Sequence, residues 1–193
     1  GPHLVTKLIA AFQRAYPGLR VSLSLGNAAA AWDNLALGRA DVVVAADAPN
    51  TPANHTVTLQ HSRLVVVVAA DHPWASRDKV ALGDLAGERT VVRERRSNTQ
   101  RMVNKLLRRR RVTLGHRLEL DSREAVIEAV AAGLGIGFIF ASEAPPDPRI
   151  RTIELRGISA HNTEVVGCLQ AQRRDSIVRA FLETVAGWRA SGA

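Results

Sequence analysis

Short, uninterrupted apolar runs constrain the fold of this chain most strongly. Residues 42–46 read VVVAA and residues 64–70 read LVVVVAA. Runs of this length, rich in β-branched valine, are typical of strands that are covered on both faces. They are far shorter than the roughly 18 residues that span a bilayer. A chain of 193 residues with such strands is expected to form one large domain or two small lobes.

Helical and strand patterns alternate along the first third of the chain. Leu4, Leu8 and Phe12 share one helical face, and Pro17 ends that helix. The following residues alternate between polar and apolar, as in a half-buried strand. This alternation predicts a doubly wound α/β lobe. Its predicted elements are a helix over 4–15, a strand over 21–25, a helix over 28–38, a strand over 42–46, and strands over 56–59 and 64–70.

A second α/β pattern begins after residue 74. Its predicted elements are strands over 89–93, 117–120 and 138–140, with helices over 97–110 and 123–132 between them. The remaining predicted elements are strands over 151–155 and 163–170 and a helix over 175–189. These elements need a sheet on which to pack, and we expect them on the first lobe. The prediction is lobe I over 1–70 and 145–193, lobe II over 71–144, and crossovers near 69–74 and 140–146.

The strand-to-helix junction at residues 93–99 is the main candidate for binding. The first turn of a helix has unpaired N–H groups and attracts anions. Ser97, Asn98 and Thr99 add short polar side chains there, and Arg93 adds a bidentate donor. Ser97 or Asn98 is also expected to cap the helix, and capping alone would explain these residues.

Three further positions are candidates for the same ligand. Ser122 and Arg123 open the next helix, and they provide either a second set of donors or a simple cap. In lobe I, Asn27 begins a helix after a predicted strand, where ligands of open α/β sheets bind, although it too could be only a cap. His3 occupies a comparable place, and the alternative is a terminal residue without a role.

Other features are weaker signals of function. The net charge of +8 suggests an anionic partner, but only 4% of residues are aromatic, which disfavours stacking on bases. The run Arg108–Arg111 is either a solvated helix end or a contact for DNA or an acidic partner. The glycines of 133–137 follow a helix and precede a strand, the wrong order for a dinucleotide loop. The single cysteine, Cys168, is expected to be an inert core thiol rather than a reactive one.

Catalytic and metal-binding patterns are lacking. None of the six histidines stands at zinc-ligand spacing to another histidine or to the cysteine, and no Gly-x-Ser-x-Gly elbow occurs. We therefore expect no enzyme activity, no metal and no cofactor.

Four segments together resemble the effector-binding domain of LysR-type transcription regulators. Residues 15–23 (AYPGLRVSL) resemble the family's YPGV-x-V-x-L stretch, and residues 37–44 (LGRADVVV) its L-x-x-G-x-L-D segment. Residues 64–74 (LVVVVAADHPW) are similar to the family's hinge strand. Residues 128–137 (EAVAAGLGIG) look like its V-x-AGLGIG hallmark. The segments occur in family order over nearly the whole chain.

The resemblance implies an α/β fold of two Rossmann-like lobes joined by two crossovers, of the type 2 periplasmic-binding-protein-like kind. It implies a small anionic effector in the interlobe cleft, a homodimer or tetramer, a cytoplasmic location and no membrane. DNA binding is expected only through an N-terminal winged-helix domain that is absent here, as is the first strand of lobe I. Within the family, residues 1–3, 93–99 and 121–124 look most like those of regulators of aminophosphonate use, and an arginine-rich helix start suits a phosphonate. Their effector would be a phosphonate such as 2-aminoethylphosphonate, with Glu124 or Asp47 on its amine.

Two other functions compete with this one. The same lobes serve in solute-binding proteins of transporters, which are usually longer and exported. An enzyme on the same scaffold would need a clustered acid and base, for which the sequence carries no signal.

Overall fold

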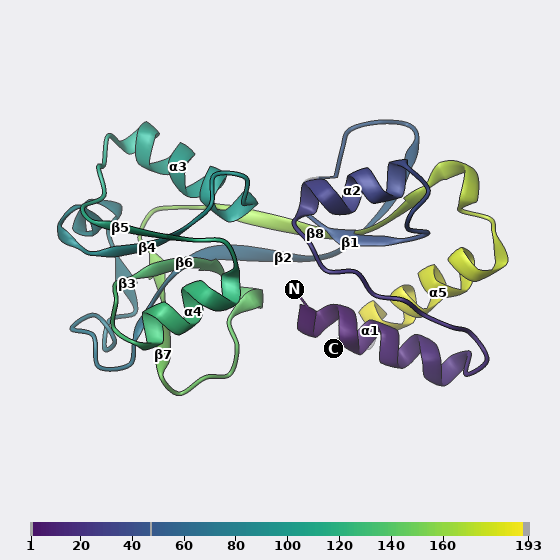
Figure 1. The fold of residues 1–193 in the computed structure, drawn as a ribbon, viewed down its shortest axis with the longest axis horizontal. Coiled ribbons are helices and arrows are strands. Elements are labelled where there is room, and N and C mark those ends of the chain that lie inside the picture. The colour runs from purple at the N-terminus through teal and green to yellow at the C-terminus, as the bar shows by residue number, and fades with distance from the viewer. Residues whose placement is uncertain (1, 47, 191–193) are drawn as a thin grey trace. The chain divides into compact units, whose positions relative to one another are not determined.

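The computed structural model consists of two compact units, which are described separately (Figure 1). The structure describes residues 2–46 and 48–190. Unit 1 comprises the chain up to residue 61 and from residue 163 onward, and unit 2 comprises residues 62–162. No helix within the described residues is long and apolar enough to cross a membrane.

Unit 1 is built on strands covered by helices. β1 (Val43–Ala45) pairs antiparallel with β8 (His161–Leu169), and the first part of β2 (Asn54–Ala69) also belongs to this unit. A short 3-10 helix, η3 (Gln170–Gln172), follows β8. α1 (Pro2–Ala15) packs on α5 (Ser176–Ala190), where the rings of Phe12 and Phe181 lie 5.2 Å apart. Apolar side chains of α1, β2, β8 and α5 form the core between them.

The second helix of unit 1 lies against the β1–β8 pair. α2 (Ala28–Ala36) begins at its cap Asn27 and places Trp32 over Gly167 of β8. The indole Nε1–H of Trp32 donates to the Ala46 carbonyl at 2.8 Å, so the buried ring has a fixed orientation. A glycine is required opposite it, because a Cβ on Gly167 would lie 2.4 Å from the indole ring.

Unit 2 contains two sheets. In the larger, the second part of β2 pairs antiparallel with β6 (Gly137–Phe140) and β7 (Ile150–Leu155), and β7 pairs parallel with β3 (Lys79–Val80). β4 (Thr90–Arg93) and β5 (Arg117–Leu120) form a parallel pair. The helices are α3 (Asn98–Arg110), α4 (Arg123–Ala131), and the 3-10 turns η1 (Leu82–Gly87) and η2 (Ala141–Glu143).

The valine run of β2 is buried on both faces, as its composition predicts. Val66 and Val68 belong to one buried cluster, whereas Val65 and Val67 belong to another, on the opposite face of the strand. Its neighbours β6 and β7 are antiparallel to it, so burial on both faces does not require a parallel sheet here.

Three expectations from the sequence are wrong in detail. Residues 21–25 form no strand, because no described strand pairs with them; Leu25 is 67% exposed. The two strands predicted over 56–59 and 64–70 are one continuous strand, β2. β7, expected on the first lobe, pairs with β2 and β3 in unit 2.

The observed boundaries therefore differ from the predicted lobes. The chain passes between units within β2, after residue 61, and within β8, after residue 162, rather than near 69–74 and 140–146. The physical reason is strand pairing: residues 64–69 hydrogen-bond to β6 and β7, which holds them in unit 2.

Candidate anion-binding site

The candidate site of unit 2 lies at the carboxyl ends of β4 and β5. These strands are parallel neighbours, with Arg93 opposite Leu120 at their ends. α3 follows β4 and α4 follows β5, so two helix N-termini begin at one edge of this sheet (Figure 1). Partial positive charge at both helix starts favours an anion at this edge.

The start of α3 carries an unsatisfied donor. Ser97 is buried and caps the helix, its Oγ accepting from the Gln100 backbone N–H at 3.4 Å. Next to it, the Nδ2 group of Asn98 is buried without a hydrogen-bond partner among the described residues. A buried amide donor left unpaired costs about 1–3 kcal/mol. Asn98 therefore contributes an unused buried donor to this site.

The buried side chain of Gln100 forms hydrogen bonds that stabilise this helix start. It accepts from the Arg93 backbone N–H at 3.0 Å and donates to Asn104 Oδ1 at 3.0 Å. These bonds tie the end of β4 to the first turns of α3. The sequence reasoning missed Gln100; a glutamine at the first turn of an otherwise basic helix was the only available signal.

Arg93 is not the free donor that the sequence suggested. Its guanidinium donates to both oxygens of Glu94, at 3.0 and 3.2 Å, and to the Asp121 carbonyl at 3.2 Å. It thereby ties the end of β4 to the end of β5. Arg95 and Arg96, by contrast, are exposed and have no charged partner within the described residues, so they are the available cations at this junction.

At the start of α4, Ser122 is confirmed as the cap, and the charge of Arg123 is compensated by carboxylates. The Oγ of Ser122 accepts from the Ala125 N–H at 3.1 Å. Arg123 donates to Glu143 at 2.9 Å and to Glu124 at 2.8 Å. Burial lowers the pKa of Arg123, but both carboxylates outweigh this and raise it overall. Arg123 therefore links α4 to η2 through its ion pair with Glu143.

The candidates in unit 1 are described only in part. Asn27 is exposed and caps α2, with its Oδ1 accepting from the Ala30 N–H at 2.9 Å. The backbone of His3 lies in α1, but its side chain is outside the described residues, as is Asp47. A role for Asn27 and His3 in ligand binding stays a prediction.

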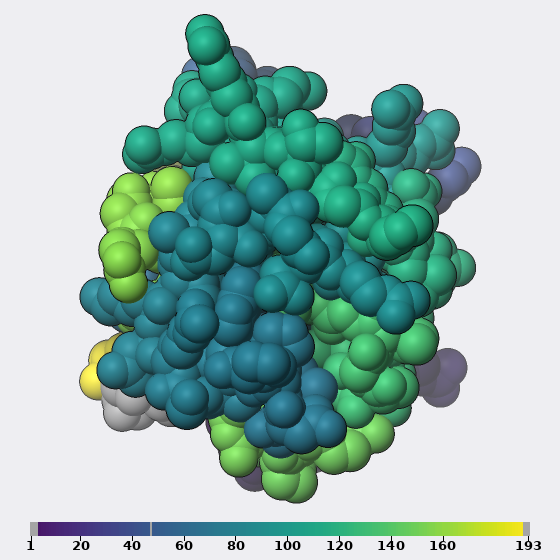
Figure 2. Space-filling view, turned by 90° about the vertical axis from the view of Figure 1, so that its left-hand side faces the viewer, coloured from purple at the N-terminus to yellow at the C-terminus, as the bar shows by residue number. Residues whose placement is uncertain are grey.

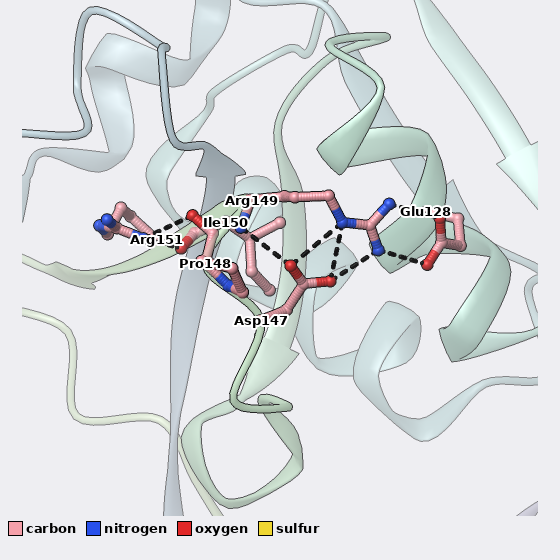
Figure 3. Close-up of polar contacts among 6 residues, drawn as sticks. All are labelled: Glu128, Asp147, Pro148, Arg149, Ile150 and Arg151. Carbon is pink, nitrogen blue, oxygen red and sulfur yellow. Dashed lines mark hydrogen bonds and ion pairs between the residues drawn. The ribbon is translucent and has the colours of Figure 1, made fainter.

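A charged cluster holds α4 to the connector that precedes β7 (Figure 3). Arg149 donates to both carboxylate oxygens of Glu128, at 2.8 and 3.0 Å, and to Asp147 at 2.7 to 3.2 Å. Hydrogen bonds from Arg149 lower the pKa of both carboxyls. Arg149 and Glu128 are exposed, so salt screens the interaction.

We expect Arg149→Gln to lower the melting temperature of the chain at pH 7, and by less at pH 3. The folded-state pKa of Glu128 and Asp147 is lowered, so their contribution is present above the ordinary values near 4. It is lost as pH falls through the lower folded-state values. Calorimetric melting at both pH values tests this; Arg156→Gln, an exposed residue with no charged partner among the described residues, is the control. An equal effect of Arg149→Gln at both pH values would contradict the assignment.

Several other sequence interpretations can be compared with the structure. Cys168 is free and fully buried, and burial raises the pKa of its thiol, as expected of an inert core residue. The glycines after α4 form a turn in which Gly133 and Gly135 have positive φ angles, as expected of a helix end. Arg108–Arg110 are exposed at the end of α3, which projects at the top of Figure 2 in teal. The described residues contain no cluster of metal-ligating side chains.

The sequence profile of the LysR substrate binding domain matches residues 1–190. This chain belongs to that family. One relative is the transcriptional activator CmpR of Synechocystis, 30% identical over 142 residues, which are 72% of this chain and 46% of CmpR. Another is the RuBisCO operon transcriptional regulator of Allochromatium vinosum, 28% identical over 137 residues (71% of this chain, 45% of the regulator). The chain thus spans about half the length of these relatives.

Solved structures confirm the fold. The regulatory domain of CcmR from Synechocystis, in complex with 2-PG, superposes with a TM-score of 0.86 at 24% identity, covering 97% of this chain and 91% of that one. The BenM effector-binding domain with benzoate gives 0.81 at 21% identity, covering 98% and 87%. The α/β architecture is therefore that of LysR effector-binding domains, the type 2 periplasmic-binding-protein-like kind.

These relatives also bear on function. They are transcription regulators, which agrees with the prediction that the chain is not an enzyme and disfavours a transporter's solute-binding protein. None of the relatives named here is a regulator of aminophosphonate use, so that finer assignment is not supported.

Proposed function

We propose that this chain is the effector-sensing domain of a LysR-type transcription regulator and binds a small anion at the start of α3. The observation that carries the proposal is the buried, unpaired Nδ2 of Asn98, at a helix N-terminus flanked by Arg95 and Arg96. An anion there would accept from Asn98, from Thr99 and from backbone N–H groups of the first turn.

The known complexes support an anionic effector. CcmR is described with 2-PG (2-phosphoglycolate), BenM with benzoate and QuiR with shikimate, and all three ligands carry a carboxylate. We propose for this chain a carboxylate or phosphoryl compound of similar size. The phosphonate 2-aminoethylphosphonate remains a candidate to be tested beside them.

The same proposal includes a mechanism of signalling. The residues that we propose for effector binding are Asn27 and His3 in unit 1, and Ser97, Asn98, Thr99 and Ser122 in unit 2. Binding would then shift the population of unit arrangements in a homodimer or tetramer. Output on DNA would pass through a winged-helix segment outside this chain, in a cytoplasmic protein. A solute-binding protein of a transporter is the alternative.

Calorimetric titration of the 193-residue chain is the direct test of the ligand class. We expect heat of binding with 2-phosphoglycolate, or with 2-aminoethylphosphonate or a simple carboxylate, in a sample shown to be folded by circular dichroism. The absence of heat with every anion, in a folded sample, would overturn the proposal. Binding of neutral sugars or amides instead would favour the transporter alternative.

Asn98→Leu is expected to separate binding from stability. The leucine removes the unpaired buried donor at similar volume, so the melting temperature should be unchanged or higher. Affinity for the anion identified above should fall about 10- to 100-fold, since a hydrogen bond to a charged group contributes roughly 1.5–3 kcal/mol.

A matched control removes the same side-chain type from the same helix. Asn104→Ala takes away an amide that is already paired with Gln100, and it leaves the Asn98 side chain in place. It should change the affinity by less than about twofold while lowering stability slightly. Equal loss of affinity in both variants would contradict a specific role for Asn98.

A further inference from the structure

A cavity of about 390 Å³ in unit 1 lies between the start of β2 and α5, and three arginines line it. Its walls come from segments far apart in the sequence: His55 from β2, Arg173 and Arg174 from the turn before α5, and Arg179 and Leu182 from α5. The volume is within the range of small-molecule sites. None of these residues belongs to the candidate site at α3.

The cationic side chains of this cavity are only partly compensated. Arg173 and Arg174 form no ion pair or side-chain hydrogen bond within the described part of the chain. Arg179 pairs with Glu183, but at 3.8 Å and with both side chains about two-thirds exposed. The cavity therefore carries two uncompensated guanidinium groups.

The pKa of His55 is sensitive to the charges around the cavity. The side chain is half-buried, and burial together with the charge of Arg173 lowers its pKa. The groups lining the cavity around it are Arg173, Arg174, Arg179 and Glu183. Near pH 7 the imidazole is thus neutral, and it can donate one hydrogen bond without adding charge.

We propose that this cavity is a second binding site for a small dianion of the phosphate type, beyond the proposed effector site. Planar guanidinium groups match phosphoryl oxygens bidentately, and Arg173 and Arg174 are free to do so. The N-terminus of α5, a helix of 15 residues, adds partial positive charge beside them. Leu182 and Ala186 form an apolar wall that suits the organic part of a phosphate ester.

The site is tested by following the His55 ring by NMR, with sulfate as a dianion whose own charge is constant between pH 5 and 8. Sulfate should raise the pKa of His55 saturably at constant ionic strength, because an anion beside the ring favours its protonated form. His61, which bonds to Thr163 outside the cavity lining, serves as the internal reference and should not respond. Inorganic phosphate at pH 7.5 should compete with sulfate.

Variants assign the effect to the cavity. Arg174→Gln should weaken sulfate binding about tenfold, and Arg173→Gln should also raise the pKa of His55 without sulfate. Arg39→Gln, an exposed residue of unit 1 outside the cavity lining, should change neither value.

Three outcomes would overturn the proposal: an equal response to chloride and sulfate, an unchanged response in both cavity variants, or a response of the His55 ring to duplex DNA but none to sulfate or phosphate. The outcome is independent of the effector site, because Asn98→Leu should leave the sulfate response of His55 intact.

Discussion

Replacing Gly135 with alanine is expected to destabilise unit 2 by about 2–5 kcal/mol, more than any other glycine substitution in that unit. Gly135 has a φ of +155°, and a Cβ there would lie 2.5 Å from the Arg89 carbonyl oxygen. Neither chain can move aside, because the Ile136 N–H donates to that same oxygen at 2.8 Å and the Val91 N–H donates to the Ile136 carbonyl at 2.8 Å.

Comparison with Gly133→Ala separates the free-energy cost of the steric clash at Gly135 from the cost of backbone strain. Gly133 also has a positive φ, +75°, but nothing lies within 4 Å of its added Cβ. Its substitution should cost only the backbone strain, about 1–2 kcal/mol. Urea denaturation followed by circular dichroism measures both variants. Equal costs for the two would show that close approach to Arg89 is not what requires glycine at 135.

Trp32→Ala is expected to destabilise unit 1 by about 3–5 kcal/mol, as for other buried aromatic residues. The ring is 6% exposed, its Nε1–H bonds to Ala46, and it covers Gly167 of β8. Gly167→Ala should also destabilise, by about 1–3 kcal/mol, because its Cβ would lie 2.4 and 2.6 Å from Cη2 and Cζ3 of the indole.

The two positions should be coupled. In a Trp32→Phe background the outer part of the indole is gone, so Gly167→Ala should cost less than in the natural chain, by about 0.5–3 kcal/mol. Chemical denaturation of the four proteins completes the cycle. Additive costs would show that the ring and the glycine do not meet as described.

The start of α3 was predictable because its signals are local. A polar triplet after a strand predicts a cap and a helix start, and Ser97 indeed caps α3. The same reasoning predicted Ser122 as the cap of α4 and Asn27 as the cap of α2. Each of these depends on residues within three positions along the chain, so no knowledge of tertiary structure was needed.

What could not be predicted depends on contacts between distant segments. Arg123 looked like a free cation, but its main partner, Glu143, is 20 residues away. The alternation at 21–25 predicts a strand, yet a strand also requires a neighbour with which to pair. The unpaired amide of Asn98 is likewise visible only once the surrounding backbone is in place.

The path of β2 and β8 also determines the order in which the units can be completed during synthesis. Unit 2 is one uninterrupted stretch of chain, whereas unit 1 needs both the first 61 residues and those from 163 onward. A ribosome adds roughly 5–20 residues per second, and domains fold as units. Unit 2 can therefore fold before β8 and α5 have been synthesised. Until then, α1, α2 and β1 lack the elements that complete unit 1. Any interruption of translation in that interval would leave the apolar faces of α1 and β1 uncovered, a state that chaperones recognise.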